Sequence, residues 1–299
     1  MSDEMSVLAG EDSVFGTVTV IGDAWSWLVL REAIFSGVTR FEDFRSRLGV
    51  ARSTLAARLE HLVAGDVLRR GPGGAYLLSD RGADFFGCLI LALTWGDRWF
   101  ADDAGIPHVV THIGCGERMS AEVRCSHCHD RVEAQAVRFE SRPRPGRADS
   151  RRHRTPDLAL LERERPSSVA RTLQVLGEHW SALILREAFF GVRRFDDFQR
   201  GLSIATNILA QRLDRLVELG VLDRVPYQEQ PLRHEYRLTR KGIDLYPVPL
   251  AMMTWGDRWL ADGNPPVPLT HLPCGERFTS VLACGHCGEP ISRTSVRFA

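Results

Sequence analysis

The chain has 299 residues, 44% of them hydrophobic and 25% charged, and its 38 basic and 38 acidic side chains give a formal net charge of zero. This composition is that of an ordinary globular protein, and the length suggests about two domains. No apolar run is long enough to span a bilayer, and the acidic start MSDEMSVLAGEDS has no signal-peptide pattern, so we expect a cytoplasmic protein with no membrane partner.

Most of the chain is an internal duplication. The hexapeptide TWGDRW occurs at 94–99 and again at 254–259, a repeat that chance does not explain. Longer matches surround it: GDAWSWLVLREAIFSGVTRFEDF (22–44) with GEHWSALILREAFFGVRRFDDF (177–198), LAARLEHLVAGDVLRR (55–70) with LAQRLDRLVELGVLDR (209–224), and THIGCGERMSAEVRCSHC (111–128) with THLPCGERFTSVLACGHC (270–287). We call residues 14–140 copy one and residues 167–299 copy two.

The residues between the copies, 141–166, are rich in arginine and proline and predict a basic flexible linker, with one short helix at 158–165. Its arginines could contact phosphates loosely, although we favour a solvated spacer.

Hydrophobic periodicity predicts the elements of copy two. In chain order they are an amphipathic helix from Val175 to Ala188, a short helix at 194–202, a third helix at 205–220, an alternating hairpin at 221–239, and a last helix that begins after Thr239 and runs to Trp259. In the third helix Leu209, Leu213, Leu216 and Val217 form one buried stripe. This order is that of a winged helix-turn-helix, so the predicted fold is α+β, mainly α, present twice.

The same motifs resemble those of a known family. Gly-x-x-Trp at 22–25 and 177–180, RFEDF and RFDDF at 40–44 and 194–198, and P-x-x-x-E-Y-x-L-T-x-x-G at 231–242 look like the HxlR-type transcriptional regulators. The resemblance covers about 20–100 and 175–260. It implies a regulator whose dimers bind double-stranded operator DNA, with the third helix in the major groove and the hairpin, called the wing, on the flanking backbone. We expect a repressor, although the sequence does not distinguish repression from activation.

The resulting domain boundaries follow the duplication. They are a winged helix-turn-helix at 14–104, a zinc-ribbon-like β-hairpin tail at 105–140, the linker at 141–166, a second winged helix-turn-helix at 167–263 and a second such tail at 264–299.

The third helix and the wing supply the candidate DNA contacts. Asn207 and Gln211 are one turn apart on the exposed face of the third helix, and either amide could pair with adenine through two hydrogen bonds. Arg58 and Arg212 hold equivalent positions and suit phosphates. The full candidate set is Arg52, Ser53, Arg58, Arg69 and Arg70 in copy one, and Thr206, Asn207, Gln211, Arg212, Arg233 and His234 in copy two.

Copy one departs from the family pattern in its wing. RRGPGGAY at 69–76 is much shorter than the corresponding loop of copy two, and Ala57 stands where copy two has Gln211. We therefore expect the two copies to differ on DNA. Neither copy has the cysteine that some family members carry before the first helix, which argues against thiol sensing of that type.

The tryptophans of TWGDRW share one helix face because they are four residues apart. In the resembled family the last helix usually builds the dimer interface. We therefore expect Trp95, Trp99, Trp255 and Trp259 to pack the copies together, as a pseudo-dimer within one chain or across a homodimer. A pocket between them for a small aromatic effector is the alternative.

Six of the seven cysteines are in the tails and form a repeated pattern. The candidate ligands are His112, Cys115, Cys125 and Cys128 in the first tail, and His271, Cys274, Cys284 and Cys287 in the second. Three thiols and one imidazole are the ligands of a closed structural zinc site, so we expect two Zn²⁺ ions per chain, one in each tail. His108, His127 or His129 could replace His112, and tails that fold without metal remain an alternative.

Two other functions compete with a zinc-containing regulator. CGHC at 284–287 is also the active-site tetrapeptide of thiol-disulfide oxidoreductases, which makes a redox enzyme or sensor conceivable. That chemistry needs the first cysteine at a helix N-terminus, whereas the strand-like run ISRTSVRF follows here, so we favour zinc and expect no catalysis. A protein-interaction adaptor that has lost DNA contact is the third hypothesis.

Overall fold

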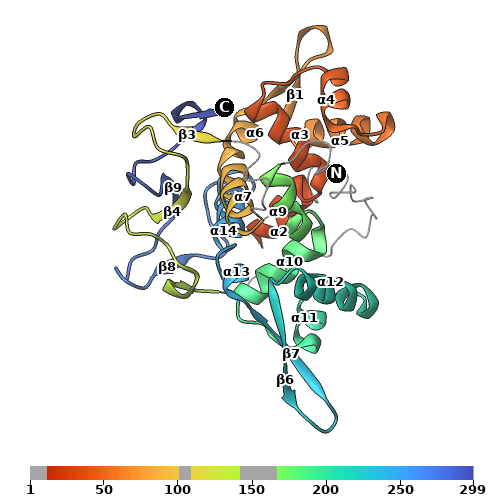
Figure 1. Ribbon diagram of the computed structural model, residues 1–299, viewed down its shortest axis with the longest axis vertical. Coiled ribbons are helices and arrows are strands. Elements are labelled where there is room, and N and C mark those ends of the chain that lie inside the picture. The colour runs from red at the N-terminus through yellow and green to blue at the C-terminus, as the bar shows by residue number, and fades with distance from the viewer. Residues whose placement is uncertain (1–11, 101–108, 142–166, 299) are drawn as a thin grey trace. The chain divides into compact units, whose positions relative to one another are not determined.

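The computed structural model describes residues 12–100, 109–141 and 167–298 (Figure 1). The predicted helix at 158–165, most of the linker and His108 lie outside these residues. The chain divides into two compact units, and each draws on both copies. The copy-one unit comprises Val20–Arg124, Arg152–Gly177 and Val281–Ala299, and the copy-two unit comprises Met1–Thr19, Cys125–Arg151 and Glu178–Ser280.

The copy-one unit is built on a winged helix-turn-helix. Its elements are α3 (Ala24–Phe35), α4 (Phe41–Leu48), α5 (Arg52–Ala64), β1 (Leu68–Arg70), the 3₁₀ turn η1 (Pro72–Gly74), β2 (Tyr76–Leu78), α6 (Asp80–Asp84) and α7 (Phe86–Trp99). Asp23 caps α3 by accepting hydrogen bonds from the backbone of Trp25 and Ser26 at 3.1 and 3.2 Å. Gly49 ends α4 with φ at 61°, where glycine carries no steric cost.

The copy-two unit repeats this order with a longer wing. Its elements are α10 (His179–Phe189), α11 (Phe195–Leu202), α12 (Thr206–Glu218), β6 (Leu222–Gln228), β7 (Arg233–Leu238), α13 (Arg240–Ile243) and α14 (Pro247–Trp259). Leu209, Leu213 and Leu216 are buried on one face of α12, as predicted, whereas Val217 is only partly buried. The α+β winged-helix fold expected from the sequence is confirmed in both units.

Two predicted helices are interrupted. The helix expected from Val175 to Ala188 is two helices, α9 (Ser168–Leu176) and α10, because the chain breaks at Gly177. A Cβ at Gly177 would lie 2.9 Å from the Cβ of Ala24, so glycine is required where the two segments meet. The helix expected from Thr239 to Trp259 is also divided, into α13 and α14, with Pro247 at the start of α14.

The first helix of each copy packs in the unit of the other copy. In the copy-one unit, α9 lies along α7 and also contacts α3, as the green and orange helices show in Figure 1. Thr172 on α9 donates a 2.6 Å hydrogen bond to the carbonyl oxygen of Ala92. In the copy-two unit, the start of α2 (Ser13–Ile21) does the same, because Thr17 donates at 2.8 Å to the carbonyl oxygen of Met252.

TWGDRW forms this contact in both units, chiefly through its glycine and aspartate. A Cβ at Gly96 would lie 2.1 Å from the carbonyl oxygen of Ser168, so only glycine lets α9 approach so closely. The hydroxyl of Ser168 donates to the carboxylate of Asp97. In copy two, Gly256 approaches Ser13 in the same way, and Asp257 accepts from the Ser13 hydroxyl at 2.5 Å.

The tryptophans of the motif, which we expected to pack the copies together, differ in their exposure. Trp95 and Trp255 are buried, whereas Trp99 and Trp259 are partly exposed. Trp95 packs edge-on against Phe100, the residue that directly follows α7. The repeated hexapeptide does join the copies, but the recorded hydrogen bonds and the closest approach run through the residues between its tryptophans.

The tails supply six short strands: β3 (Val110–His112), β4 (Ala121–Cys125), β5 (Val137–Phe139), β8 (Leu269–His271), β9 (Ser280–Cys284) and β10 (Val296–Phe298). We expected one hairpin in each tail, but the strands pair between tails. β3 pairs with β10, β4 with β9 and β5 with β8. Phe298 of β10 stacks on Phe35 of α3 with ring centroids 4.3 Å apart, so the end of one tail packs on the winged helix of the other copy.

No single helix in the described residues is long and apolar enough to cross a membrane. One adjacent pair, α2 and α3, meets the length and composition test only when taken together, and these helices are bent by 79°.

Replacing Gly96 with Ala should destabilise the protein, because the added methyl group overlaps the backbone of Ser168. Overpacking of this kind costs about 1–3 kcal/mol. Gly87→Ala in the same helix is the matched control: its Cβ would meet nothing closer than Leu282 at 3.8 Å, so it should be neutral or stabilising by about 0.5–1 kcal/mol. Denaturant unfolding measures both, and equal stability of Gly96→Ala and wild type would refute the close contact.

The Asp257 carboxyl predicts a pH dependence of stability. Burial raises its pKa from 3.8 to about 6, against the opposing effect of the Ser13 hydrogen bond. Because the folded-state pKa is the higher one, the stabilisation is complete at low pH and is lost as the pH rises from about 4 to about 6. Relative to Asp257→Asn, wild type should lose up to about 3 kcal/mol of unfolding free energy over this window. Parallel stability profiles for the two proteins would contradict this.

Candidate metal centres and DNA-reading surface

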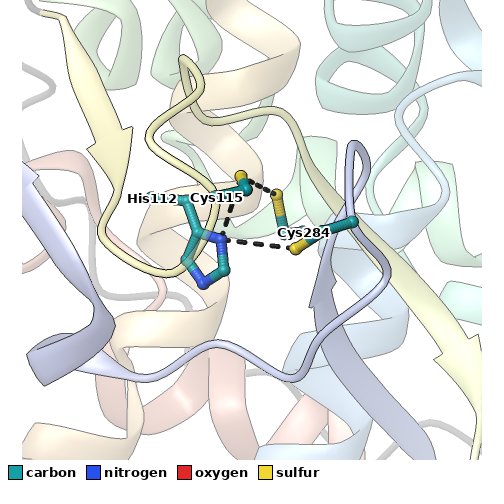
Figure 2. Close-up of side chains that lie close together, drawn as sticks. His112, Cys115 and Cys284 are labelled. Carbon is teal, nitrogen blue, oxygen red and sulfur yellow. Dashed lines mark hydrogen bonds between the residues drawn. The ribbon is translucent and has the colours of Figure 1, made fainter.

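The copy-one unit brings four of the candidate metal ligands together. They are His112 and Cys115 from the first tail and Cys284 and Cys287 from the second, with ligand atoms all within 4.8 Å of one another. Nδ1 of His112 lies 3.3 Å from Sγ of Cys115 and 3.4 Å from Sγ of Cys287. The two sulfurs of Cys115 and Cys284 are 4.0 Å apart. Figure 2 shows His112, Cys115 and Cys284 pointing toward one point.

The copy-two unit contains the complementary set. Cys125 and Cys128 come from the first tail, and His271 and Cys274 come from the second. Nδ1 of His271 lies 3.3 Å from Sγ of Cys128 and 3.6 Å from Sγ of Cys274. All eight predicted residues are therefore gathered into two Cys₃His sets, and His112 rather than His127 or His129 belongs to its set.

Tight turns place the two ligands of each pair on the same side. The backbone N–H of Gly116 donates to the carbonyl of His112 at 2.8 Å, and Gly288 donates to Cys284 at the same distance. Both glycines have φ near 75°, a backbone conformation that residues other than glycine rarely adopt. The same kind of turn follows His271, and these turns fix the i, i+3 spacing that the sequence shows.

The spacing within each set fits a tetrahedral ion. With zinc–sulfur bonds near 2.3 Å and zinc–nitrogen bonds near 2.0–2.1 Å, the ligand atoms of a tetrahedron lie about 3.5–3.8 Å apart. The recorded separations of 3.3 to 4.0 Å fall around this range. They are much longer than a disulfide bond of about 2.05 Å, and all these cysteines are free thiols.

Cys284 is the thiol best prepared to ionise. Its burial opposes the charged form, but the backbone amides of Cys287 and His286 donate hydrogen bonds to its sulfur, and the net result is a lowered pKa. Thiolates are the form in which cysteine binds zinc.

The grouping of the ligands differs from the one expected. We placed one site in each tail, closed by a hairpin between its two ligand pairs. Instead, each set joins the His-x₂-Cys pair of one tail to the Cys-x₂-Cys pair of the other. The cause is the strand pairing: β10 lies beside β3, and β5 beside β8, so each His-x₂-Cys turn meets strands of the opposite tail.

The CGHC segment does not have the surroundings of a disulfide oxidoreductase. After Cys287 the chain turns at Gly288, and the next helical residues in this described stretch are the short 3₁₀ turn η3 (Arg293–Ser295). A helix N-terminus, which would lower the pKa of the attacking thiol, does not follow Cys284 here.

The DNA-reading surface of copy two has exposed polar side chains. Asn207 and Gln211 are both exposed on the first turns of α12, and among the described residues neither side chain makes a hydrogen bond. The hydroxyl of Thr206 accepts a 2.7 Å hydrogen bond from Gln199, which orients it at the helix start. Arg233 is exposed at the wing, and His234 beside it is partly buried.

In copy one the equivalent positions are largely engaged within the protein. Arg52 is exposed but pairs with Glu42 at 2.8 Å, and Arg70 pairs with Glu60 while lying over the Tyr76 ring. Ser53 and Arg69 are exposed.

Arg58 and Arg212, which we predicted to contact phosphates, each pair with an acidic residue of their own domain. Arg58 is 9% exposed and pairs with Asp23 at 3.1 Å, and Arg212 pairs with Glu178 at 2.5 Å. Asp23 and Glu178 are the N-cap residues of α3 and α10. Arg58 therefore links α5 to the start of α3, and Arg212 links α12 to the start of α10. Both guanidiniums are therefore engaged within the domain, and their contact with phosphates stays a prediction.

One feature near the wing escaped sequence reasoning. The guanidinium of Arg194 lies over the ring of Tyr227 on β6, 4.7 Å from its centroid. Arg194 belongs to the RFDDF motif, which we used only to recognise the family. The motif therefore also contacts the wing near its turn, and the sequence gives no sign of this contact because it depends on how the hairpin folds.

Comparison with known families decides the relationship. A family model described as HxlR-like helix-turn-helix matches residues 20–104 and 175–264, which together make up more than half of the chain. The chain belongs to this family. The predicted resemblance is thereby confirmed for both copies.

Relatives of this HxlR-like protein point to the same function. The uncharacterized HTH-type transcriptional regulator MT3179 of Mycobacterium tuberculosis is 50% identical over 138 residues, 46% of this chain and 87% of the relative. The uncharacterized HTH-type regulator sll1512 of Synechocystis is 38% identical over 93 residues, 31% of this chain and 69% of the relative. The protein is a DNA-binding transcriptional regulator.

Among solved structures, PA1374 of Pseudomonas aeruginosa, a proposed transcription factor, is 42% identical to the chain of this HxlR-like regulator. The match covers 41% of this chain and 84% of that chain, with a TM-score of 0.32.

Paired cysteine substitutions should reveal how the ligands are grouped. Cys115→Ser with Cys284→Ser removes two ligands from one set, so the protein should lose about one of two zinc ions. Cys115→Ser with Cys125→Ser damages both sets and should lose both ions. Elemental analysis after gel filtration measures the content, and the reverse pattern would show that each tail holds its own ion.

Proposed function

We propose that this regulator is a repressor that reads operator DNA with α12 and the wing of β6 and β7. It acts as a pseudo-dimer formed by the two copies, with one structural zinc ion in each Cys₃His set. The observation that carries the proposal is the exposure of Asn207 and Gln211 at the start of α12. Side-chain amides at that position can satisfy the donor and acceptor of an adenine edge in the major groove.

The wing supports a second kind of contact. β6 and β7 form an antiparallel hairpin that extends away from α11 and α12 in Figure 1, with exposed Arg233 at the start of the returning strand. An exposed guanidinium on a projecting hairpin is suited to the phosphates beside the groove. Base recognition and backbone attraction would therefore come from different elements of the same domain.

The exchange of segments supports the pseudo-dimer. Each unit takes its winged helix from one copy and its first helix from the other. Two separate chains could assemble in the same way, so the copies stand in for the two subunits of a dimer. Zinc fits this assembly because each set needs both tails, and ribbons whose strands have only three to five residues bury too little apolar surface to fold without such a link.

Repression follows from the family resemblance and is the simplest consequence of occupying an operator. A transcriptional reporter under the promoter of the protein's own operon would test it: deletion of the gene should raise expression, and a fall in expression would identify an activator.

The DNA contacts are tested by separating base reading from charge. Asn207→Ala should cost about 1–3 kcal/mol on the operator and little on scrambled duplex, because it removes a base contact. Arg233→Ala should weaken binding to both duplexes and flatten the salt dependence by about one unit, because it removes a phosphate contact. Titrations over a salt series provide both quantities.

Glu229→Ala, on the same wing and without positive charge, is the control for the Arg233 substitution. Equal losses on both duplexes for Asn207→Ala would mean that α12 does not read sequence. No loss for any variant would favour the adaptor hypothesis.

A further inference from the structure

The two recognition helices differ at the positions that face outward. Aligning Leu55 with Leu209 places Ser53 opposite Asn207 and Ala57 opposite Gln211. All four residues are exposed in their units. Copy two therefore presents two amides that can each form a pair of hydrogen bonds with a base, while copy one presents a single hydroxyl and a methyl group.

Several arginines of copy one are also paired within the protein, although Arg69 is exposed. Arg52 is held by Glu42, whose other oxygen accepts from Arg45 at 2.8 Å. Arg70 is held by Glu60, and Arg40 donates at 2.5 Å to the carbonyl of Gly73. These pairs engage guanidiniums that would otherwise be available to phosphates.

The wing of copy one is short, and Arg40 holds its turn. β1 and β2 have three residues each, a reach of about 10 Å, whereas the seven residues of β6 span about 23 Å. Gly73 sits at the turn with its backbone fastened to Arg40. In copy two the corresponding Arg194 instead lies over Tyr227 on the long wing, and the pair equivalent to Arg70 and Glu60, Arg224 with Asp214, is 3.9 Å apart.

We propose that only copy two reads DNA sequence, so that the operator is a single asymmetric site rather than an inverted repeat of two equal half-sites. This inference rests on the proposed function and specifies its DNA partner. Copy one then contributes its exchanged helix and tail to the folded protein. Because copy one lacks the two amides, it loses about 5- to 150-fold discrimination between the correct and a wrong base for each missing contact.

The test is selection of binding sequences by the full-length, metal-loaded protein from a library of randomised duplexes. We expect one contiguous motif without internal symmetry. Enrichment of an inverted repeat, with two equivalent halves about one helical turn apart, would overturn the inference while supporting the proposed function. If no sequence is enriched, the proposed function itself fails, and the inference fails with it.

Matched substitutions in the two copies give a second readout on the selected duplex. Asn207→Ala and Gln211→Ala should each weaken binding about 5- to 150-fold. Ser53→Ala and Arg52→Ala, at the equivalent helix of copy one, should change it less than about twofold. A loss for the copy-one variants as large as that for the copy-two variants would overturn the inference.

Discussion

The close contact between the last helix of one copy and the first helix of the other is the constraint on which the rest of the structure depends. It exists because Gly96 and Gly256 leave room for a backbone carbonyl where any side chain would collide. The neighbouring aspartates then accept the serine hydroxyls at the starts of α9 and α2. On folding, these serine and aspartate side chains exchange hydrogen bonds with water for hydrogen bonds with each other. The exchange is possible only when the two helices pack in one particular register. The motif is therefore a positional lock as well as an apolar contact.

The cysteine sets follow the same logic by different chemistry. Neither tail supplies four ligands in one place, and the short strands leave little apolar area to hold the ribbons together. Coordination of a metal ion could supply the missing free energy, because four ligands ordered by one ion replace a core that small ribbons cannot build. Side-chain contacts also join the tails to the winged helices. Examples are the ring pair of Phe35 and Phe298 in one unit and that of Phe139 and Phe190 in the other.

Local features were predictable from the sequence, and pairing between distant segments was not. The stripe of Leu209, Leu213 and Leu216 and the alternation of the wing follow from periodicity alone. The break at Gly177 was missed because helical spacing continues across it. The ligand residues were found, yet their grouping was not, since two tails with the same spacing can close four-ligand sites within a tail or between tails. The ion pairs of Arg58 and Arg212 were missed because their acidic partners, Asp23 and Glu178, are more than 30 residues away in the sequence.

The reciprocal exchange of segments changes what a genetic dissection of this protein would report. A lesion in α9 belongs to copy two by sequence, but it damages the unit that carries the winged helix of copy one. Cutting the gene between the repeats would take a helix from each folded body and two thiols from each ligand set. The phenotype of such a mutation would consequently point to the wrong copy. The two repeats can diverge freely only on surfaces that take no part in the exchange of segments.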